Sequence, residues 1–138
     1  PFARPLPRDE AANPDVLIAG CGSGESAIEA ALSYRDARVL AVDENAENLA
    51  YGSRQAQLLN LQRIEFARAD LTKLAATGRS FDVIEASGLM YHADPQAALD
   101  ALIALLRPGG VMRIRLLGEA ATRVLAAAHD FAQQGNYQ

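Results

Sequence analysis

Three closely spaced glycines, Gly20, Gly22 and Gly24, follow an apolar run in this sequence, with Cys21 between the first two. Glycine tolerates backbone angles that other residues avoid, and it lets a ligand approach the main chain closely. A helix that begins after such a loop also offers free backbone amides. The spacing predicts a loop in contact with a small molecule, although a tight turn without a ligand has the same composition.

The residue after the third glycine is Glu25. In the fingerprint of dinucleotide-binding loops a glycine falls at this position, near the pyrophosphate. A carboxylate would repel a pyrophosphate, so the loop favours a ligand without phosphates. A nicotinamide-dependent oxidoreductase is therefore a less favoured alternative.

An acidic pair, Asp43 and Glu44, ends a second apolar run, and Asp43 stands 23 positions after Gly20. An acidic side chain at this place can accept hydrogen bonds from both hydroxyls of a ribose, and it repels a 2′-phosphate. The alternative is that Asp43 caps a helix that starts near Asn45, a role that Glu44 or Asn45 could also take.

A second pair of residues, Asp70 and Leu71, follows the next short apolar run. The carboxylate of Asp70 could accept a hydrogen bond from an adenine amino group while Leu71 covers the ring. The alternative is that Asp70 is the N-cap of a short helix. Ribose hydroxyls and an apolar ring face need different partners, and the chain offers both in order.

These residues stand at the ends of predicted elements. Apolar runs predict five strands, at 15–20, 38–43, 64–67, 81–86 and 111–117. Helical spacing and caps predict helices at 23–34, 45–59, 71–76, from Asp94-Pro95 to a stop at 107–110, and at about 119–134. In the last strand Arg113 and Arg115 share one face, which we expect to be exposed to water.

The alternation of strands and helices implies right-handed crossovers and parallel strands. We therefore predict an α/β fold, a Rossmann-like doubly wound parallel sheet in three α/β/α layers. Ligands bind such sheets at the carboxyl ends of the strands, near the switch point beside the first strand. The glycines, Asp43 and Asp70 are all expected at this edge.

Composition restricts the function classes. The 138 residues are enough for one domain, 1–138, with an irregular lead-in at 1–14. A formal net charge of −4 and the absence of a Lys/Arg-rich block make nucleic acid a disfavoured partner. The single cysteine excludes an internal disulfide and fits a cytoplasmic location. No Cys/His cluster has metal-ligand spacing, and no apolar run could span a membrane. Both ends suggest a piece of a longer chain.

The motifs VLIAGCGSG, VLAVD, FARADL, FDVIEASGLMYHADP and LLRPGG together resemble class I S-adenosylmethionine-dependent methyltransferases over nearly the whole chain. More narrowly, the sequence resembles bacterial methyltransferase domains fused to tetratricopeptide repeats, in which an IAGCG loop, an FDVIE strand and an HADP segment recur. The resemblance implies S-adenosylmethionine as the cofactor.

The resemblance also implies residue roles. Gly20, Gly22 and Gly24 would line the methionine and ribose portions of the cofactor, and Cys21 and Glu44 belong to the same predicted site. Asp43 would bind the ribose, and Asp70 and Leu71 the adenine. Ala86 and Ser87 would lie near the transferable methyl group.

Two departures from the family pattern matter. Many members have an acidic residue where this chain has Ala19, so we expect one polar contact to the cofactor to be lost and binding to be weaker. The family also completes its sheet with two further strands, which we expect this chain to lack. The fifth strand would then be an edge, through which the chain could self-associate.

Methyl transfer needs an aligned acceptor more than it needs a base. If the acceptor must lose a proton, the candidates are Tyr91, His92, Asp94 and Glu85, and His92 is the best placed of them. The alternative is that Tyr91 and His92 only form the pocket wall while Asp94 caps its helix. His129 is predicted to be a packing or surface residue.

The sequence thus predicts a methyltransferase for an unidentified acceptor. A non-catalytic cofactor-binding or interaction module remains the main alternative, since Ala19 replaces an acidic residue and no base is obvious.

Overall fold

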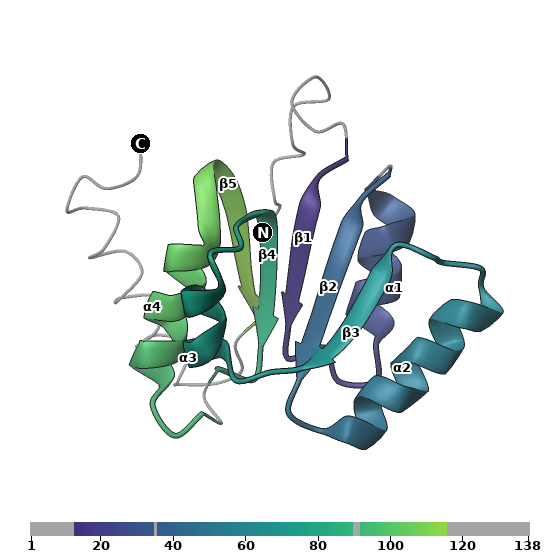
Figure 1. Ribbon diagram of the computed structural model, residues 1–138, viewed down its shortest axis with the longest axis horizontal. Helices are drawn as coiled ribbons and strands as arrows, with labels where there is room; N and C mark the ends of the chain where they lie inside the picture. Colours follow the sequence, from purple (N-terminus) through teal and green to yellow (C-terminus); the bar gives the residue numbers. More distant parts are fainter. Residues whose placement is uncertain (1–12, 35, 90–91, 116–138) are drawn as a thin grey trace.

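The computed structural model describes residues 13–34, 36–89 and 92–115, and every element below lies within them. Five strands form one parallel sheet in the order β3-β2-β1-β4-β5 (Figure 1). Their bounds are β1 Asp15–Ala19, β2 Arg38–Asp43, β3 Ile64–Arg68, β4 Phe81–Ser87 and β5 Leu106–Arg115. The predicted doubly wound parallel sheet is confirmed.

Helices cover both faces of the sheet and complete three layers (Figure 1). They are α1 Glu25–Ser33, α2 Ala46–Leu58, α3 Leu71–Leu74 and α4 Pro95–Leu105, with a 3₁₀ turn, η1, at Ala75–Thr77. One apolar core joins α1 and α2 to one face, and a second core joins α3 and α4 to the other.

Alternation along the central strand explains why both faces need helices. In β1, Val16 and Ile18 belong to the core under α1 and α2, while Leu17 and Ala19 belong to the core under α3 and α4. All four are at most 1% exposed. Because successive strand side chains point to opposite faces, a strand that is apolar throughout must be covered on both sides.

The predicted element ends differ from the observed ones near the glycines. The first strand ends at Ala19 because Gly20 adopts a φ of 72°, outside the strand region. The first helix was predicted from residue 23 but begins at Glu25, since Gly24 has a φ of 95° and is the N-cap. The short third helix ends at Leu74 and continues as η1.

The start of the last strand was predicted wrongly. The residues at 107–110 end α4 as expected, but they lie inside β5, which starts at Leu106 and not at Val111. Phe81 pairs with Leu106 while Val83 pairs with Val111, so the turn-forming residues are accommodated as an irregularity in the pairing. Residues 116–117 and the helix predicted at about 119–134 lie outside the described residues, as does most of the predicted lead-in.

A network of charged side chains joins the amino ends of four strands. Arg107 donates hydrogen bonds to Asp15 at 2.7 Å, to Asp82 at 2.8 Å and to Ser80 at 3.0 Å. Asp15 also pairs with Arg38 at 2.8 Å. The hydrogen bond to Asp15 and the charge of Asp82 raise the pKa of Arg107.

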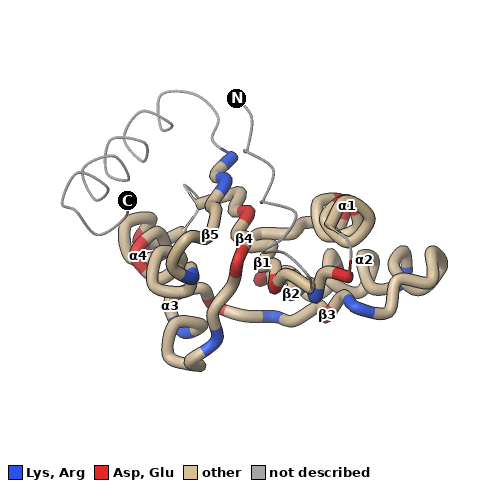
Figure 2. Tube along the Cα trace, turned by 90° about the horizontal axis from the view of Figure 1, so that it is seen from above, with Lys and Arg blue, Asp and Glu red and all other residues tan. Residues whose placement is uncertain are grey.

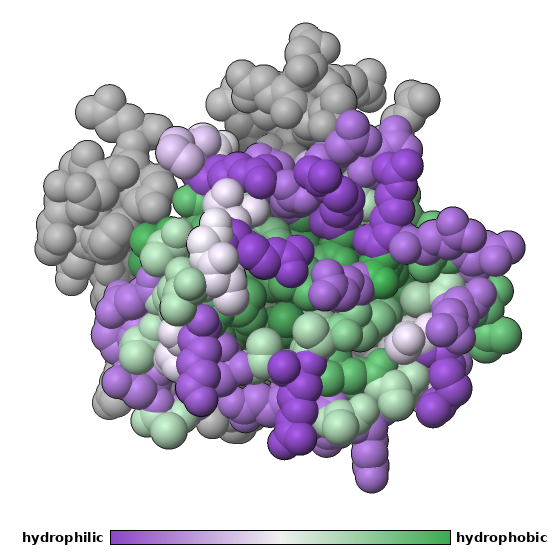
Figure 3. Space-filling view, viewed as in Figure 1, coloured by the Kyte–Doolittle hydropathy of each residue, from purple (hydrophilic) through white to green (hydrophobic). Residues whose placement is uncertain are grey.

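Views from two sides place this polar edge in the molecule. Figure 2 looks onto the amino edge of the sheet, where basic and acidic residues lie next to one another. In the space-filling view, hydrophilic residues form a band along the same edge above a more apolar surface (Figure 3). As predicted, Arg113 and Arg115 on β5 are exposed. Within the described ranges, no helix has the length and apolar character needed to cross a membrane.

Candidate functional site

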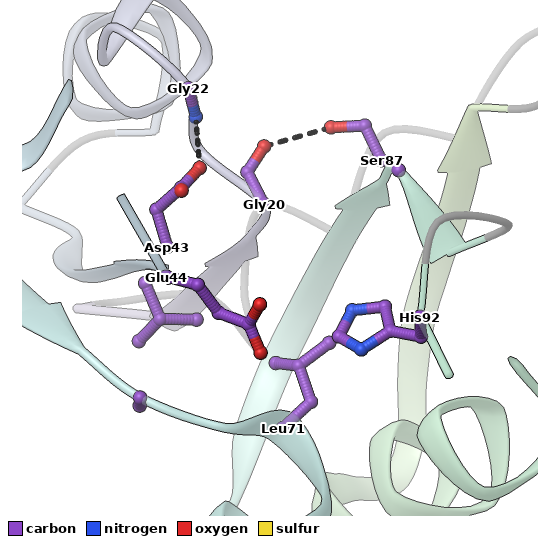
Figure 4. Close-up of a pocket in the computed structure, with 10 residues that line it drawn as sticks. Gly20, Gly22, Asp43, Glu44, Leu71, Ser87 and His92 are labelled. Atoms are coloured by element: carbon purple, nitrogen blue, oxygen red, sulfur yellow. Dashed lines mark hydrogen bonds between the residues drawn. The ribbon is translucent and has the colours of Figure 1, made fainter. Parts of the chain in front are cut away.

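A cavity of about 270 Å³ opens at the carboxyl edge of the sheet, where the ends of β1, β2 and β4 meet (Figure 4). It lies near the lower end of the size range of small-molecule sites. Its lining residues are Gly20, Gly22, Val42, Asp43, Glu44, Ala69, Leu71, Ser87, Gly88 and His92. The predicted edge of the sheet therefore contains a cavity.

Seven predicted site residues line this cavity: Gly20, Gly22, Asp43, Glu44, Leu71, Ser87 and His92. The prediction missed Val42, Ala69 and Gly88, which are apolar or lack a side chain and carry no chemical signal of their own. Each of the three is the sequence neighbour of a predicted residue at a strand end. That adjacency is the signal that could have identified them.

The glycine loop is tied to the end of β2 by its backbone. The amides of Gly20 and Cys21 donate to the carbonyl oxygen of Val42 at 2.9 and 3.0 Å, and the amide of Gly22 donates to Asp43 at 2.8 Å. Gly20 and Gly22 have φ values of 72° and 52°, which favour glycine. The loop is held in a backbone conformation that few other residues could adopt.

Asp43 joins this loop to the start of α2. Its Oδ2 accepts from Gly22, and its Oδ1 accepts from the amide of Asn45 at 2.8 Å. The N-cap of α2 is Asn45, whose side chain accepts from the amides of Glu47 and Asn48. The capping alternative for Asp43 is therefore wrong, and its carboxylate faces the loop and the cavity (Figure 4).

Asp70 has a different place. It is the N-cap of α3, and it accepts from the amide of Thr72 at 2.9 Å and from its hydroxyl at 2.7 Å. These two hydrogen bonds hold the pKa of Asp70 below its usual value. The capping alternative is thus confirmed for Asp70, which does not line the cavity, whereas Leu71 does. The hydrogen bond between Asp70 and an adenine amino group stays a prediction.

Three other predicted cofactor residues do not line the cavity. Ala86 is 2% exposed and Cys21 is 6% exposed, and each side chain belongs to one of the two cores. Burial raises the pKa of the Cys21 thiol to about 11, and the nearby Asp43 adds to the rise. Gly24 packs against α2, where a Cβ atom would lie 2.8 Å from the Cα of Gly52.

The opposite wall of the cavity contains Ser87 and His92 (Figure 4). The Ser87 hydroxyl donates to the carbonyl oxygen of Gly20 at 3.0 Å. The backbone amide of His92 donates to the carbonyl of Leu89 at 3.2 Å. Tyr91 lies outside the described residues.

Two weaker candidates for a base have other partners. Glu85 forms an ion pair with Arg113 at 3.4 Å and does not line the cavity. Asp94 accepts from the amide of Ala97 at 3.0 Å and is the N-cap of α4. Of the candidates within the described residues, only His92 lines the cavity.

The relatives found by comparison with known proteins include named methyltransferases. Over 99 residues the chain is 38% identical to a ubiquinone biosynthesis O-methyltransferase of Psychrobacter arcticus, covering 70% of this chain and 38% of that protein. It is 32% identical over 124 residues to a ubiquinone/menaquinone biosynthesis C-methyltransferase of Bdellovibrio bacteriovorus, covering 89% of this chain and 52% of that protein. The chain therefore spans about two fifths to half the length of these relatives.

Solved structures agree on the fold. One similar structure is PKMT2 from Rickettsia typhi in complex with AdoHcy, with a TM-score of 0.67 at 23% identity over 74% of this chain and 20% of that one. The family profile described as "Methyltransferase domain" matches residues 16–110, which include all five strands except Asp15 of β1 and the last part of β5. This chain belongs to the methyltransferase domain family.

Proposed function

We propose that this domain binds S-adenosylmethionine in the cavity at the carboxyl edge and transfers its methyl group to an acceptor. The observation that carries the proposal is the position of Asp43 beside the glycine loop. Each Asp43 oxygen accepts one backbone hydrogen bond at 2.8 Å. A carboxylate oxygen has two lone pairs, so each oxygen can also accept from one ribose hydroxyl.

The residues of the cavity suit this cofactor chemically. None of the lining residues is a lysine or arginine, and two of them, Asp43 and Glu44, are carboxylates. Such a cavity suits a cationic ligand without phosphates, and it supports S-adenosylmethionine over a dinucleotide. Gly20 leaves room for the ligand, and Leu71 supplies an apolar surface that an adenine ring could contact.

When bound, the cofactor supplies a sulfonium-activated methyl group to a nucleophile aligned with the carbon–sulfur bond. The protein's contribution is then alignment and exclusion of water, which can lower the barrier by about 7 to 11 kcal/mol. His92 lies on the wall opposite Asp43 (Figure 4). An imidazole there could accept a proton from an acceptor hydroxyl near neutral pH.

The relatives do not indicate which chemical class of acceptor this domain methylates. One relative is named an O-methyltransferase and the other a C-methyltransferase, so their names do not select the acceptor atom. The narrower resemblance to domains fused to tetratricopeptide repeats likewise stays a prediction. The family assignment argues against the nicotinamide-dependent alternative.

Calorimetric titration with S-adenosylhomocysteine, beside NAD, tests the binding step. We expect S-adenosylhomocysteine to bind and NAD not to bind. Asp43→Ala should weaken binding by at least about a hundredfold, because two charge-assisted hydrogen bonds are lost. The matched control is Asp100→Ala, which removes an exposed aspartate of α4 that does not line the cavity.

Binding of NAD alone, or equal affinity in wild type and Asp43→Ala, would contradict the proposed site. An equally large loss in Asp100→Ala would show that the effect is not specific to Asp43, whereas a loss in Asp70→Ala would support the predicted adenine contact. Because Asp43 also holds the loop, thermal unfolding of each variant must show that it is folded before its affinity is interpreted.

A non-catalytic binding module is the second candidate. Ala19 is fully buried in the core, so this position offers the cofactor no charged contact. Tight binding of S-adenosylhomocysteine together with no labelled product from a panel of oxygen, nitrogen and carbon acceptors would favour this function. Labelled product from any acceptor would exclude it.

A further inference from the structure

Hydrogen bonds hold the glycine loop both toward β2 and toward β4, and the donor groups differ between the two directions. Toward β2, the amides of Gly20 and Gly22 donate to Val42 and Asp43. Toward β4, the hydroxyl of Ser87 donates to the carbonyl oxygen of Gly20 at 3.0 Å (Figure 4). In the described part of the chain, this is the side-chain hydrogen bond that joins the loop to β4.

Ser87 also limits where Gly20 can be. A Cβ atom on Gly20 would collide with the carbonyl oxygen of Ser87, and the φ of 72° at Gly20 is itself strained for other residues. The pairing of Ala19 with Ala86 places the two residues next to each other at the strand ends. The backbone of Ser87 therefore sets how closely Gly20 approaches the end of β4, and its hydroxyl sets the direction of the Gly20 carbonyl.

The hydrogen bond also sets what Ser87 presents to the cavity. A serine hydroxyl has one donor and two acceptor lone pairs. Its donor is used by Gly20, and both residues line the cavity. Toward a ligand, this wall therefore offers acceptors at Ser87 Oγ and at the remaining lone pair of the Gly20 carbonyl.

We propose that Ser87 is a positioning residue for cofactor binding, which acts by locking the Gly20 carbonyl and with it the glycine loop against β4. The proposal rests on the proposed function. It differs from the role near the transferable methyl group that the family resemblance implied, because here Ser87 acts through the loop. Loss of the hydroxyl should then weaken every ligand that contacts the loop.

The experiment compares wild type, Ser87→Ala and Ser87→Thr for binding of S-adenosylhomocysteine and of 5′-methylthioadenosine, which lacks the amino-acid portion. Ser87→Ala should weaken both ligands by about tenfold, the cost of one net hydrogen bond. Ser87→Thr keeps the hydroxyl and should retain most of the affinity. Ser87→Cys, with a weak donor of similar shape, should be intermediate and replaces the alanine variant if that one does not fold.

Ser80→Ala is the matched control. Ser80 is also half-buried and also makes one side-chain hydrogen bond, but its partner is Arg107 at the opposite edge of the sheet. Any loss of stability in Ser80→Ala should leave the affinity for both ligands unchanged. Thermal unfolding of all variants separates stability from binding.

Three results would overturn this proposal without overturning the proposed function. Unchanged affinity in Ser87→Ala, with wild type binding normally, refutes it while leaving the proposed function intact. A loss confined to S-adenosylhomocysteine shows that Ser87 contacts the amino-acid portion directly. A threonine variant that is folded but binds as weakly as the alanine variant shows that the hydroxyl is not responsible. If wild type binds neither ligand, the proposed function and this inference fall together.

Discussion

Cys21 lies between two glycines of the loop that borders the cavity, yet its side chain is buried in the core under α1 and α2. Its thiol makes a 3.7 Å contact with the carbonyl of Gly22 and is close enough to Asp43 for the carboxylate to disfavour a thiolate. Burial, and to a smaller extent the charge of Asp43, raise the pKa of the thiol and keep the sulfur protonated. The residue fills space in the loop, and its burial and raised pKa disfavour a nucleophilic role.

We therefore expect slow modification of Cys21 in the native chain. With a pKa of about 11, the thiolate at pH 8 is scarce. Reaction with a disulfide reagent should be on the order of a hundredfold slower than for a free cysteine, before burial slows it further. Urea should restore the normal rate. A native rate close to that of a free thiol would show that the loop opens readily.

Asp43 and Asp70 show what single-residue prediction could and could not do. Both are aspartates that follow an apolar run and precede a helix, so cofactor binding and helix capping were the alternatives for each. The outcome depends on where the helix starts: Asp70 is itself an N-cap, whereas Asp43 stands two residues before the N-cap Asn45. Boundaries at this level of detail are the least certain part of a sequence-based prediction.

At the level of elements, the number and order of the strands were predictable because each strand contains a short apolar run and the helices between them are amphipathic or capped. The start of β5 was not, because the residues Arg107 to Gly110 carry a strong stop signal. That signal was correct for α4, which ends at Leu105. Pairing with β4 then recruits the same residues into the sheet, and pairing is a tertiary interaction that local sequence does not reveal.

Helix α2 gives a test of a local stabilising interaction. Asn45 accepts hydrogen bonds from the amides of Glu47 and Asn48 at 2.9 and 3.1 Å. Asn45→Ala should lower the free energy of unfolding by about 1 kcal/mol, because amides of the first turn lose their partner. Urea titration followed by circular dichroism measures the change. Arg54→Ala, an exposed position in the same helix, is the control and should change stability by less than about 0.5 kcal/mol.

A stability loss of similar size in both variants would show that the cap contributes nothing specific. Because the N-cap Asn45 stands two residues after Asp43 and its amide donates to that carboxylate, the cap also supports one side of the cavity. A modest loss of affinity for S-adenosylhomocysteine is therefore expected in Asn45→Ala and not in Arg54→Ala.

On the scale of the whole molecule, the two edges of the sheet have different tasks. The carboxyl edge holds the cavity, whereas the amino edge holds the network in which Arg107 contacts Asp15, Asp82 and Ser80. These partners belong to or directly precede β1 and β4, so one side chain from β5 ties three strands together. This network could not be predicted from the sequence, since its members are separated by up to 92 positions.

Arg107→Ala should destabilise the fold by about 1 to 2 kcal/mol, since it removes several charge-assisted hydrogen bonds from a side chain that is 37% exposed. Arg38→Ala, at 65% exposure, should cost less than about 1 kcal/mol. Thermal and urea unfolding measure both. Equal effects would show that the network acts only as ordinary surface ion pairs. Neither variant should alter binding at the opposite edge.

The strand order also has a consequence for how the chain is made. β1 lies in the middle of the sheet, with β2 on one side and β4 on the other. As the chain leaves the ribosome, β2 follows β1 closely, but β4 starts only roughly 60 residues after the end of β1. Synthesis of these residues takes about 3 to 12 seconds at ordinary rates. During this interval one edge of the most apolar strand has no neighbour. A nascent chain stalled before β4 should therefore bind chaperones that a chain stalled after β5 does not.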